Sequence, residues 1–233
     1  MSIRLAIPFT VLLLFATSAA AQLQQGLIRG TVLAPNGNAV EDAHVSAGVM
    51  KGSNILTEQS ADTDSHGQFV FSGLALGEYR LSAEKTEAGY LSTGIDILNG
   101  RKPALTITLT EEIPSSTALI HLGPKAGIIT GWVLDSLTGS TISAKLSLSP
   151  VNGSSWSMTG TNQKFKFRVL VPADTAFRLG ACADGYKPWF YADPSRPGSP
   201  VPVQLASGAE LNVVIKLEPV PDRAKMSCAA STF

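Results

Sequence analysis

Residues 68–81, QFVFSGLALGEYRL, decide how this chain folds. The first half alternates, with Phe69 and Phe71 on one side, and the second half does the same with Tyr79 and Leu81. Alternation with a period of two is typical of half-buried β-strands, and the glycines between the halves favour a tight connection. This stretch therefore predicts two successive strands that turn one apolar face toward a core.

Similar alternation continues on both sides of this pair. Residues 26–33 (GLIRGTVL) and 42–47 (DAHVSA) precede it, with a Pro-Asn-Gly-Asn turn at 35–38, and residues 104–110 (ALTITLT) follow it. Several short strands separated by Gly, Pro and Asn turns are typical of an all-β sandwich, and the mature chain shows almost no helical periodicity.

The same order of pieces then occurs a second time. The matching segments are 127–134 (GIITGWVL), 164–171 (KFKFRVLV), 177–181 (FRLGA) and 211–217 (LNVVIKL). We match the last of these to the strand at 104–110. Repetition over about 100 residues indicates one supersecondary plan used twice, hence two tandem β-sandwich domains.

The N-terminal residues predict export. Arg4 precedes an apolar run at 5–15, and Ala19–Ala21 precede Gln22, which is the layout of a secretory signal peptide with a cut near Ala21. The apolar run is too short for a membrane span, which needs about 20 residues, so no span is expected once the leader is removed. The predicted location is secreted or periplasmic.

These observations predict five segments along the chain. They are a signal peptide at 1–21, a first sandwich at 22–112, a linker at 113–125, a second and more divergent sandwich at 126–218, and a loose tail at 219–233.

The first repeat resembles a known family. Gly30-Thr31-Val32, the turn at 35–37, Ala43-His44-Val45 and the run from Thr63 to Leu81 are similar to the carboxypeptidase regulatory-like domain. The resemblance implies a seven-stranded, transthyretin-like (prealbumin-like) Greek-key sandwich, so that the fold class is two tandem Greek-key β-sandwiches. It also implies a non-catalytic role as a spacer, folding aid or binding platform, in a family whose members accompany peptidases and surface proteins and whose related folds include carbohydrate-binding ones.

Composition argues against several function classes. Lys and Arg total 18, Asp and Glu total 18, and no basic stripe occurs, so nucleic acid is not an expected partner. His44, His66 and His121 fit no metal-binding or catalytic spacing, and no Gly-x-Ser-x-Gly elbow is present. We therefore predict no enzyme activity, no catalytic residue and no cofactor.

Residues 62–67 (DTDSHG) open like a calcium loop. The twelfth position of that loop class holds a bidentate Glu, but here it is Gly73. We interpret the segment as a polar turn in which Asp64 bonds its own backbone, and predict no metal site.

Four aromatic residues are the candidate binding residues: Tyr186, Trp189, Phe190 and Tyr191. Aromatic rings on a loop can stack on sugars or on partner side chains, but they can equally form an apolar plug that closes one end of a sandwich. Trp132 points away from its inward neighbours Gly131 and Val133. It either faces the other domain or a partner, or is an edge residue packed beneath a loop.

Two cysteines, Cys182 and Cys228, form a possible disulfide in an exported chain. Alternation places Cys182 on the outer face of its strand, so such a bond would pin the tail to the outside of the second sandwich. Asn152-Gly153-Ser154 fits an N-glycosylation acceptor or a plain turn.

The sequence favours a non-catalytic exported protein with a structural or protein-interaction role in the cell envelope or outside the cell. One alternative is a carbohydrate- or polymer-binding module that uses the aromatic loop. A second alternative is an accessory unit of a peptidase. The expected partner is accordingly a protein or a glycan.

Overall fold

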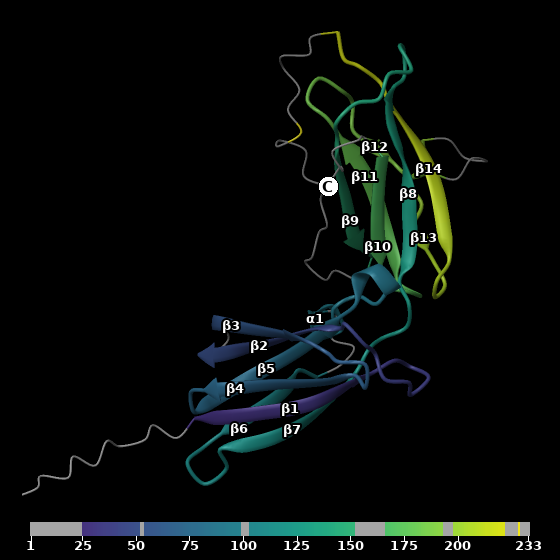
Figure 1. Cartoon of the computed structure of the whole chain (residues 1–233). Helices are drawn as coiled ribbons and strands as arrows, with labels where there is room; N and C mark the ends of the chain where they lie inside the picture. The colour runs from purple at the N-terminus through teal and green to yellow at the C-terminus, as the bar shows by residue number, and fades with distance from the viewer. Residues whose placement is uncertain are drawn as a thin grey trace, which may run out of the picture.

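Two β-sandwiches, each with its own hydrophobic core, make up the described part of the chain (Figure 1). The computed structural model describes residues 25–51, 54–98, 103–151, 166–192, 198–221 and 228. The predicted signal peptide at 1–21 and the possible glycosylation acceptor at 152–154 lie outside these residues. The all-β class and the two tandem sandwiches predicted from the sequence are confirmed.

The first sandwich has seven strands: β1 (Gly26–Leu33), β2 (His44–Lys51), β3 (Asn54–Asp62), β4 (Gln68–Leu74), β5 (Gly77–Glu84), β6 (Leu105–Leu109) and β7 (Ser115–His121). One sheet has the order β4-β1-β7 and the other β3-β2-β5-β6. A short 3-10 helix, η1 (Thr86–Ala88), and a short α1 (Thr93–Leu98) follow β5. Neither helix was expected from the sequence.

The stretch at 68–81 forms β4 and β5 as its alternation predicts. Phe69, Phe71, Tyr79 and Leu81 are all buried in the first core. Gly73 lies near the end of β4 with a φ of 71°, where the pairing of β4 with β1 is irregular. Glycine reaches this conformation without the steric cost that other residues carry, so the sequence places it where the strand departs from regular pairing.

Strand β7 corrects the predicted boundaries of the first sandwich. The segment at 113–125 was expected to be a linker, but Ser115–His121 pair in parallel with β1. Ala118, Ile120 and Leu122 are buried in the first core. The linker prediction failed because Pro114-Ser115-Ser116 is typical of a connection, whereas the alternation of Ala118, Ile120 and Leu122 indicates a strand.

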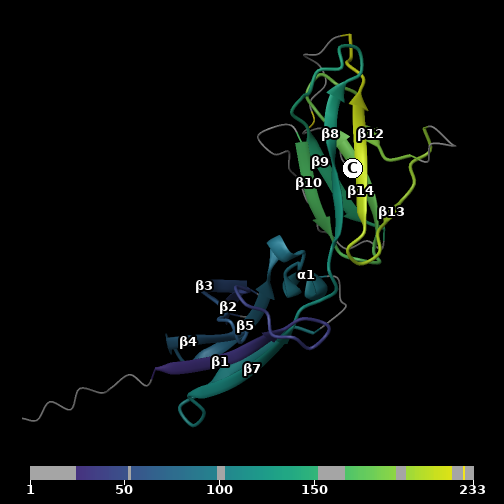
Figure 2. The same cartoon turned by 45° about the vertical axis from the view of Figure 1, so that its right-hand side comes forward.

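The second sandwich has β8 (Gly127–Asp135), β9 (Lys145–Pro150), β10 (Lys166–Val171), β11 (Ala176–Cys182), β12 (Trp189–Phe190), β13 (Val203–Gln204) and β14 (Glu210–Leu217). One sheet has the order β10-β8-β14. In the other, β11 pairs with β9 on one side and with β12 and β13 on the other. Figure 2 shows β8 and β14 side by side at the front of this sandwich.

Strand pairing shows how the two repeats correspond. Strand β14 pairs in parallel with β8 just as β7 pairs with β1, so the counterpart of β14 is β7. The match made from the sequence, to the strand at 104–110, is wrong, since that strand is β6 and its place beside β5 is taken in the second repeat by β13 beside β11.

A glycine packed against a phenylalanine occurs at the same place in both sandwiches. Gly30 lies opposite Phe69 across the β1–β4 pair, and Gly131 lies opposite Phe167 across the β8–β10 pair. Both phenylalanines are buried. The missing side chain on one strand leaves the room that the ring on the next strand fills.

The connection between the sandwiches is short and bonded at both ends. Leu122 is buried in the first core, and its N–H donates to the Leu33 carbonyl at 2.9 Å. Four residues later, the Ala126 N–H donates to the Gly89 carbonyl at 2.8 Å. Lys125 Nζ also lies 5.9 Å from the centre of the Tyr90 ring.

Candidate functional site

The four candidate aromatic residues lie on and around β12, at one edge of the second sandwich. Tyr186 follows Gly185, whose φ of 81° turns the chain after β11. Trp189 and Phe190 form β12 and pair with Ala181 and Gly180 of β11. The segment is therefore fixed to the sheet by backbone pairing.

The aromatic side chains differ in what they contact. Tyr186 is buried in the second core, while Trp189 and Tyr191 are partly buried and pack against that core. The rings of Trp189 and Tyr191 meet edge to face, with centroids 6.3 Å apart and an interplanar angle of 79°. Phe190 has 39% of its surface exposed. The arrangement is not a flat platform of parallel rings.

Tyr186 binds a buried carboxylate that the sequence did not single out. Its hydroxyl donates to Asp135 Oδ2 at 2.9 Å, while Asp135 Oδ1 accepts from the N–H groups of Leu137 and Thr138 at 2.8 and 3.0 Å. Asp135 is only 4% exposed. The signal available in the sequence was the Asp-Ser-Leu-Thr-Gly turn that follows β8, but nothing in it indicates that a residue 51 positions away completes the site.

Cys182 and Cys228 form a disulfide with a Cα–Cα distance of 5.5 Å. Cys182 sits at the end of β11, and the alternation placed it on the outer face. It is nevertheless buried, as Cys228 is. The Cys228 N–H donates to Asp184 Oδ1 at 2.8 Å, which adds a second contact between this part of the tail and the loop after β11.

The tail predicted to be loose from residue 219 is bonded at its start. Pro219 forms a bridge with Tyr186, and the Val220 N–H donates to the Gly185 carbonyl at 3.0 Å. The prediction is therefore wrong for these residues. Hydrophobic periodicity could not predict this pairing, because the start of the tail bonds to a loop and not to a strand.

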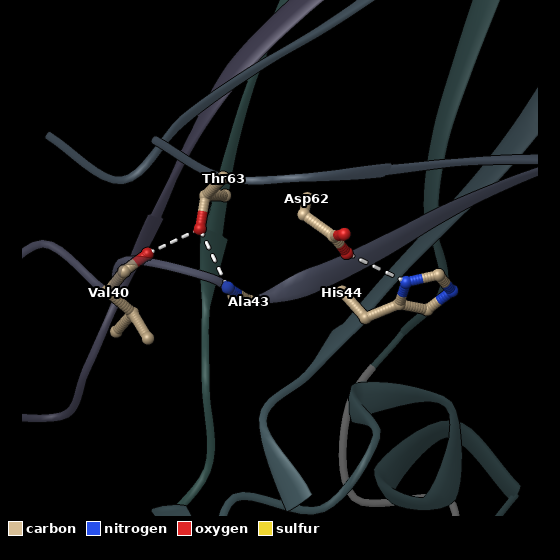
Figure 3. A network of polar contacts seen from close by, with 5 residues as sticks. All are labelled: Val40, Ala43, His44, Asp62 and Thr63. Atoms are coloured by element: carbon tan, nitrogen blue, oxygen red, sulfur yellow. Dashed lines mark hydrogen bonds and ion pairs between the residues drawn. The ribbon is translucent and has the colours of Figure 1, made fainter. Parts of the chain in front are cut away.

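A polar cluster in the first sandwich joins the loop before β2 to the end of β3 (Figure 3). The buried Thr63 hydroxyl donates to the Val40 carbonyl at 2.6 Å and accepts from the Ala43 N–H at 2.8 Å. Beside it, His44 Nδ1 and Asp62 Oδ1 lie 3.0 Å apart, and both side chains are exposed. Thr63 thus links the backbone of two segments, and the His44–Asp62 pair is exposed to solvent.

The turn at 62–67 bonds in the way that the sequence suggested. Asp64 Oδ1 accepts from the N–H groups of His66 and Gln68 at 2.8 and 2.9 Å. The bond from Gln68 is the largest cause that lowers the pKa of Asp64 below its usual 3.8, with smaller help from His66. The Asp64 carboxylate therefore stabilises the turn through these two hydrogen bonds.

Within the described ranges, no group of three or more His, Cys, Asp or Glu side chains is arranged to hold a metal ion. Among the described helices, none has the length and apolar character required to cross a membrane. The polar contacts described above are made largely to backbone groups or between pairs of side chains.

Trp132 lies on the outer face of the β10-β8-β14 sheet. It is 38% exposed, and Val214 beside it on β14 is 50% exposed. Lys166, its neighbour on β10, places Nζ 5.8 Å from the centre of the indole ring. Trp132 thus points away from the second core, as the alternation of β8 predicts.

Residues 27–110 match the family model described as the carboxypeptidase regulatory-like domain. A search of the curated proteins found no match.

Solved structures with similarity to this chain include three pilins. A streptococcal ancillary pilin has 16% identity and a TM-score of 0.39, and the match covers 86% of this chain and 64% of that one. GBS52, the minor pilin of Streptococcus agalactiae, has 11% identity, a TM-score of 0.37 and coverage of 84% and 97%. The shaft pilin SpaA of Lactobacillus rhamnosus GG has 11% identity, a TM-score of 0.35 and coverage of 84% and 98%. The chain thus spans less than two thirds of the ancillary pilin. At these scores nothing about function follows.

Proposed function

We propose that this protein, whose residues 27–110 match the carboxypeptidase regulatory-like domain, is exported and has no catalytic activity. Its role is that of a structural and interaction unit. It would act in the cell envelope or outside the cell. The observation that carries the proposal is the Cys182–Cys228 disulfide, because such bonds form and persist in oxidising compartments and are rare in the cytosol. The leader-like residues at 1–21 support the same location.

The use of the polar side chains supports a structural role. Asp135 and Asp64 accept backbone N–H groups in turns, and Thr63 links the loop before β2 to the end of β3. These contacts stabilise connections between strands. The short connection at 122–126, bonded at both ends, supports a role in which two sandwiches are held in sequence as a spacer or platform.

Cell fractionation tests this proposal. The full chain carrying a C-terminal tag is expected outside the cytoplasm, with Gln22 as its first residue. Its cysteines should resist alkylation until a reductant is added. The control lacks residues 2–21 and should stay in the cytoplasm with reactive thiols. Retention of the full chain in the cytoplasm, uncut and with reactive thiols, contradicts the proposal.

Carbohydrate or polymer binding through Tyr186, Trp189, Phe190 and Tyr191 is the first alternative, and the exposure of Phe190 favours it. The burial of Tyr186 and the edge-to-face packing of Trp189 on Tyr191 give it less support, because stacking on a sugar uses an open ring face. The second alternative, an accessory unit of a peptidase, rests on the family description of residues 27–110. It predicts that the chain co-purifies with a peptidase.

A further inference from the structure

The outer face of the β10-β8-β14 sheet, here called the Trp132 face, carries an exposed aromatic ring among cations. Strand register places Lys166, Trp132 and Val214 in one row across the three strands. The next row holds Arg168, Thr130 and Asn212. We propose that the Trp132 face binds an anionic polysaccharide, which deepens the proposed function by naming a partner class and rests on it.

The fold itself does not require a tryptophan at this position. In the first sandwich the equivalent row consists of Gln68, Thr31 and Leu119, so the same sheet is built with a threonine in place of Trp132. Tryptophan side chains are usually well buried, yet this one is 38% exposed on a sheet face. An exposed large ring with no part in either core is a feature of binding surfaces.

The charges around Trp132 are of one sign. Lys166, Arg168 and Lys216 are exposed, and register places each of them one strand away from β8, in the row of Trp132 or two residues along. Neighbouring strands lie about 4.8 Å apart and two residues span about 6.8 Å. The Cα atoms of all three cationic residues therefore lie within roughly 8 Å of the Cα atom of Trp132. Glu210 is the exposed acid on the same three strands, and it lies at the far end of β14.

This arrangement favours an anion, since the face has an excess of two positive charges in a chain whose formal net charge is zero. The bonded pair formed by Asn212 Nδ2 and Thr130 Oγ1, 3.1 Å apart, adds exposed amide and hydroxyl groups beside the ring. A chain that alternates sugar rings and carboxylates meets each of these groups. The ring stacks on the indole, the hydroxyls bond Asn212 and Thr130, and the carboxylates pair with the cations.

An acidic protein fits this face less well. Trp132 and Val214 are the exposed large apolar side chains on the strands of the Trp132 face, while Ile128 and Leu134 are half-buried and Leu170 is buried. Stable protein interfaces are built around an apolar core with a polar rim, and a face with two exposed apolar side chains provides little of that core. A polysaccharide needs only local stacking and charge pairing along its length.

Binding of the purified exported chain to immobilised polygalacturonate tests the inference. Dextran serves as the neutral polymer and polyglutamate as the anionic polymer without sugar rings. We expect binding to polygalacturonate that weakens as salt is added, because exposed charge pairs are screened. Binding to dextran and to polyglutamate should be weaker.

The main variant is Trp132→Thr, which installs the residue found at the equivalent position in the first sandwich. It should weaken binding about three- to ten-fold, the range expected when one aromatic contact is lost. The triple variant Lys166→Gln, Arg168→Gln, Lys216→Gln should weaken it at least about five-fold and remove most of the salt dependence. Retention of the thermal unfolding midpoint shows that each variant is folded.

Matched controls separate this face from the rest of the molecule. Phe190→Ala removes another exposed aromatic ring, and Arg29→Gln, Lys51→Gln, Lys145→Gln removes three exposed cations elsewhere. Both should bind as the wild type does.

Absence of wild-type binding to polygalacturonate, equal binding to polyglutamate, or loss with Phe190→Ala but not with Trp132→Thr would each overturn the inference. The fractionation result stands independently of all three, so a failure here is distinguishable from a failure of the proposed function.

Discussion

At the scale of single residues, the paired glycine and phenylalanine set the packing of both sandwiches. A Cβ added at Gly131 would meet the Val213 carbonyl well inside contact distance and lie 2.8 Å from Phe167 Cζ. The carbonyl belongs to a paired strand and cannot move aside. Overpacking a core typically costs about 1–3 kcal/mol, and we expect Gly131→Ala to lower the free energy of unfolding of the second sandwich by about 3 kcal/mol or more. Urea unfolding measures this change.

Gly94→Ala is the control for this substitution. Its added Cβ has Ser92 Oγ at 3.3 Å as its nearest neighbour, a partly buried side-chain hydroxyl that can rotate aside. It should change stability by less than about 0.5 kcal/mol. A Gly131→Ala chain as stable as the wild type would show that β8 and β14 lie further apart than described.

The lowered pKa of Asp64 predicts that the stability of the first sandwich depends on pH. Its pKa in the folded chain lies below 3.8, chiefly because its carboxylate accepts the Gln68 N–H. A group with a lowered folded pKa stabilises the fold above its unfolded pKa, and this contribution is lost as the pH falls through the folded value. Asn keeps the acceptor but not the charge. The wild type should therefore have a higher thermal midpoint than Asp64→Asn at neutral pH, and the difference should vanish in acid. A constant difference across the titration would contradict this account.

Polar contacts between residues close in the sequence could be predicted, and those between distant residues could not. The Asp64 turn is local, so its bonds could be anticipated from the Asp-Ser-His-Gly pattern. The Asp135–Tyr186 bond joins residues 51 positions apart, and no local pattern encodes it.

At the scale of elements, β7 is the strand whose role can be tested most directly. Ile120 is buried in the first core, whereas Ile113, just before β7, is 60% exposed. Ile120→Ala should cost the first sandwich about 2–5 kcal/mol, the usual range for a large-to-small change in a core. Ile113→Ala is its matched control and should cost less than about 0.5 kcal/mol. Hydrogen exchange of the β1 and β5 amides reports the difference, and equal effects of the two variants would mean that 113–125 is a linker after all.

Elements with strong alternation could be predicted, and those defined by long-range pairing could not. Strands β4, β5 and β11 have apolar residues at every second position, and each was expected near its observed bounds. Strand β7 is stabilised by parallel pairing with β1, nearly 90 residues earlier, so its turn-like beginning dominated the local signal. Strand β12 has two residues, which is too short for any periodicity.

At the scale of the whole molecule, the two cores share no residue, so each sandwich should respond alone to a change in its own half. The Cys182–Cys228 bond closes a loop with a sequence separation of 46 that contains β12, β13 and β14. In the chain-entropy model a loop of this size stabilises the fold by about 4 kcal/mol, because the unfolded chain is restricted.

Replacing both cysteines, Cys182→Ala with Cys228→Ala, should therefore destabilise the second sandwich by up to about 4 kcal/mol and leave the first unchanged. Hydrogen exchange separates the two, since the amides of β1 and β5 report on one core and those of β8 and β11 on the other. Reducing the wild type should reproduce the effect of the double variant. Parallel destabilisation of both sandwiches would show instead that the bonded connection at 122–126 couples them into one cooperative unit, because stability lost in one half would then be shared by the other.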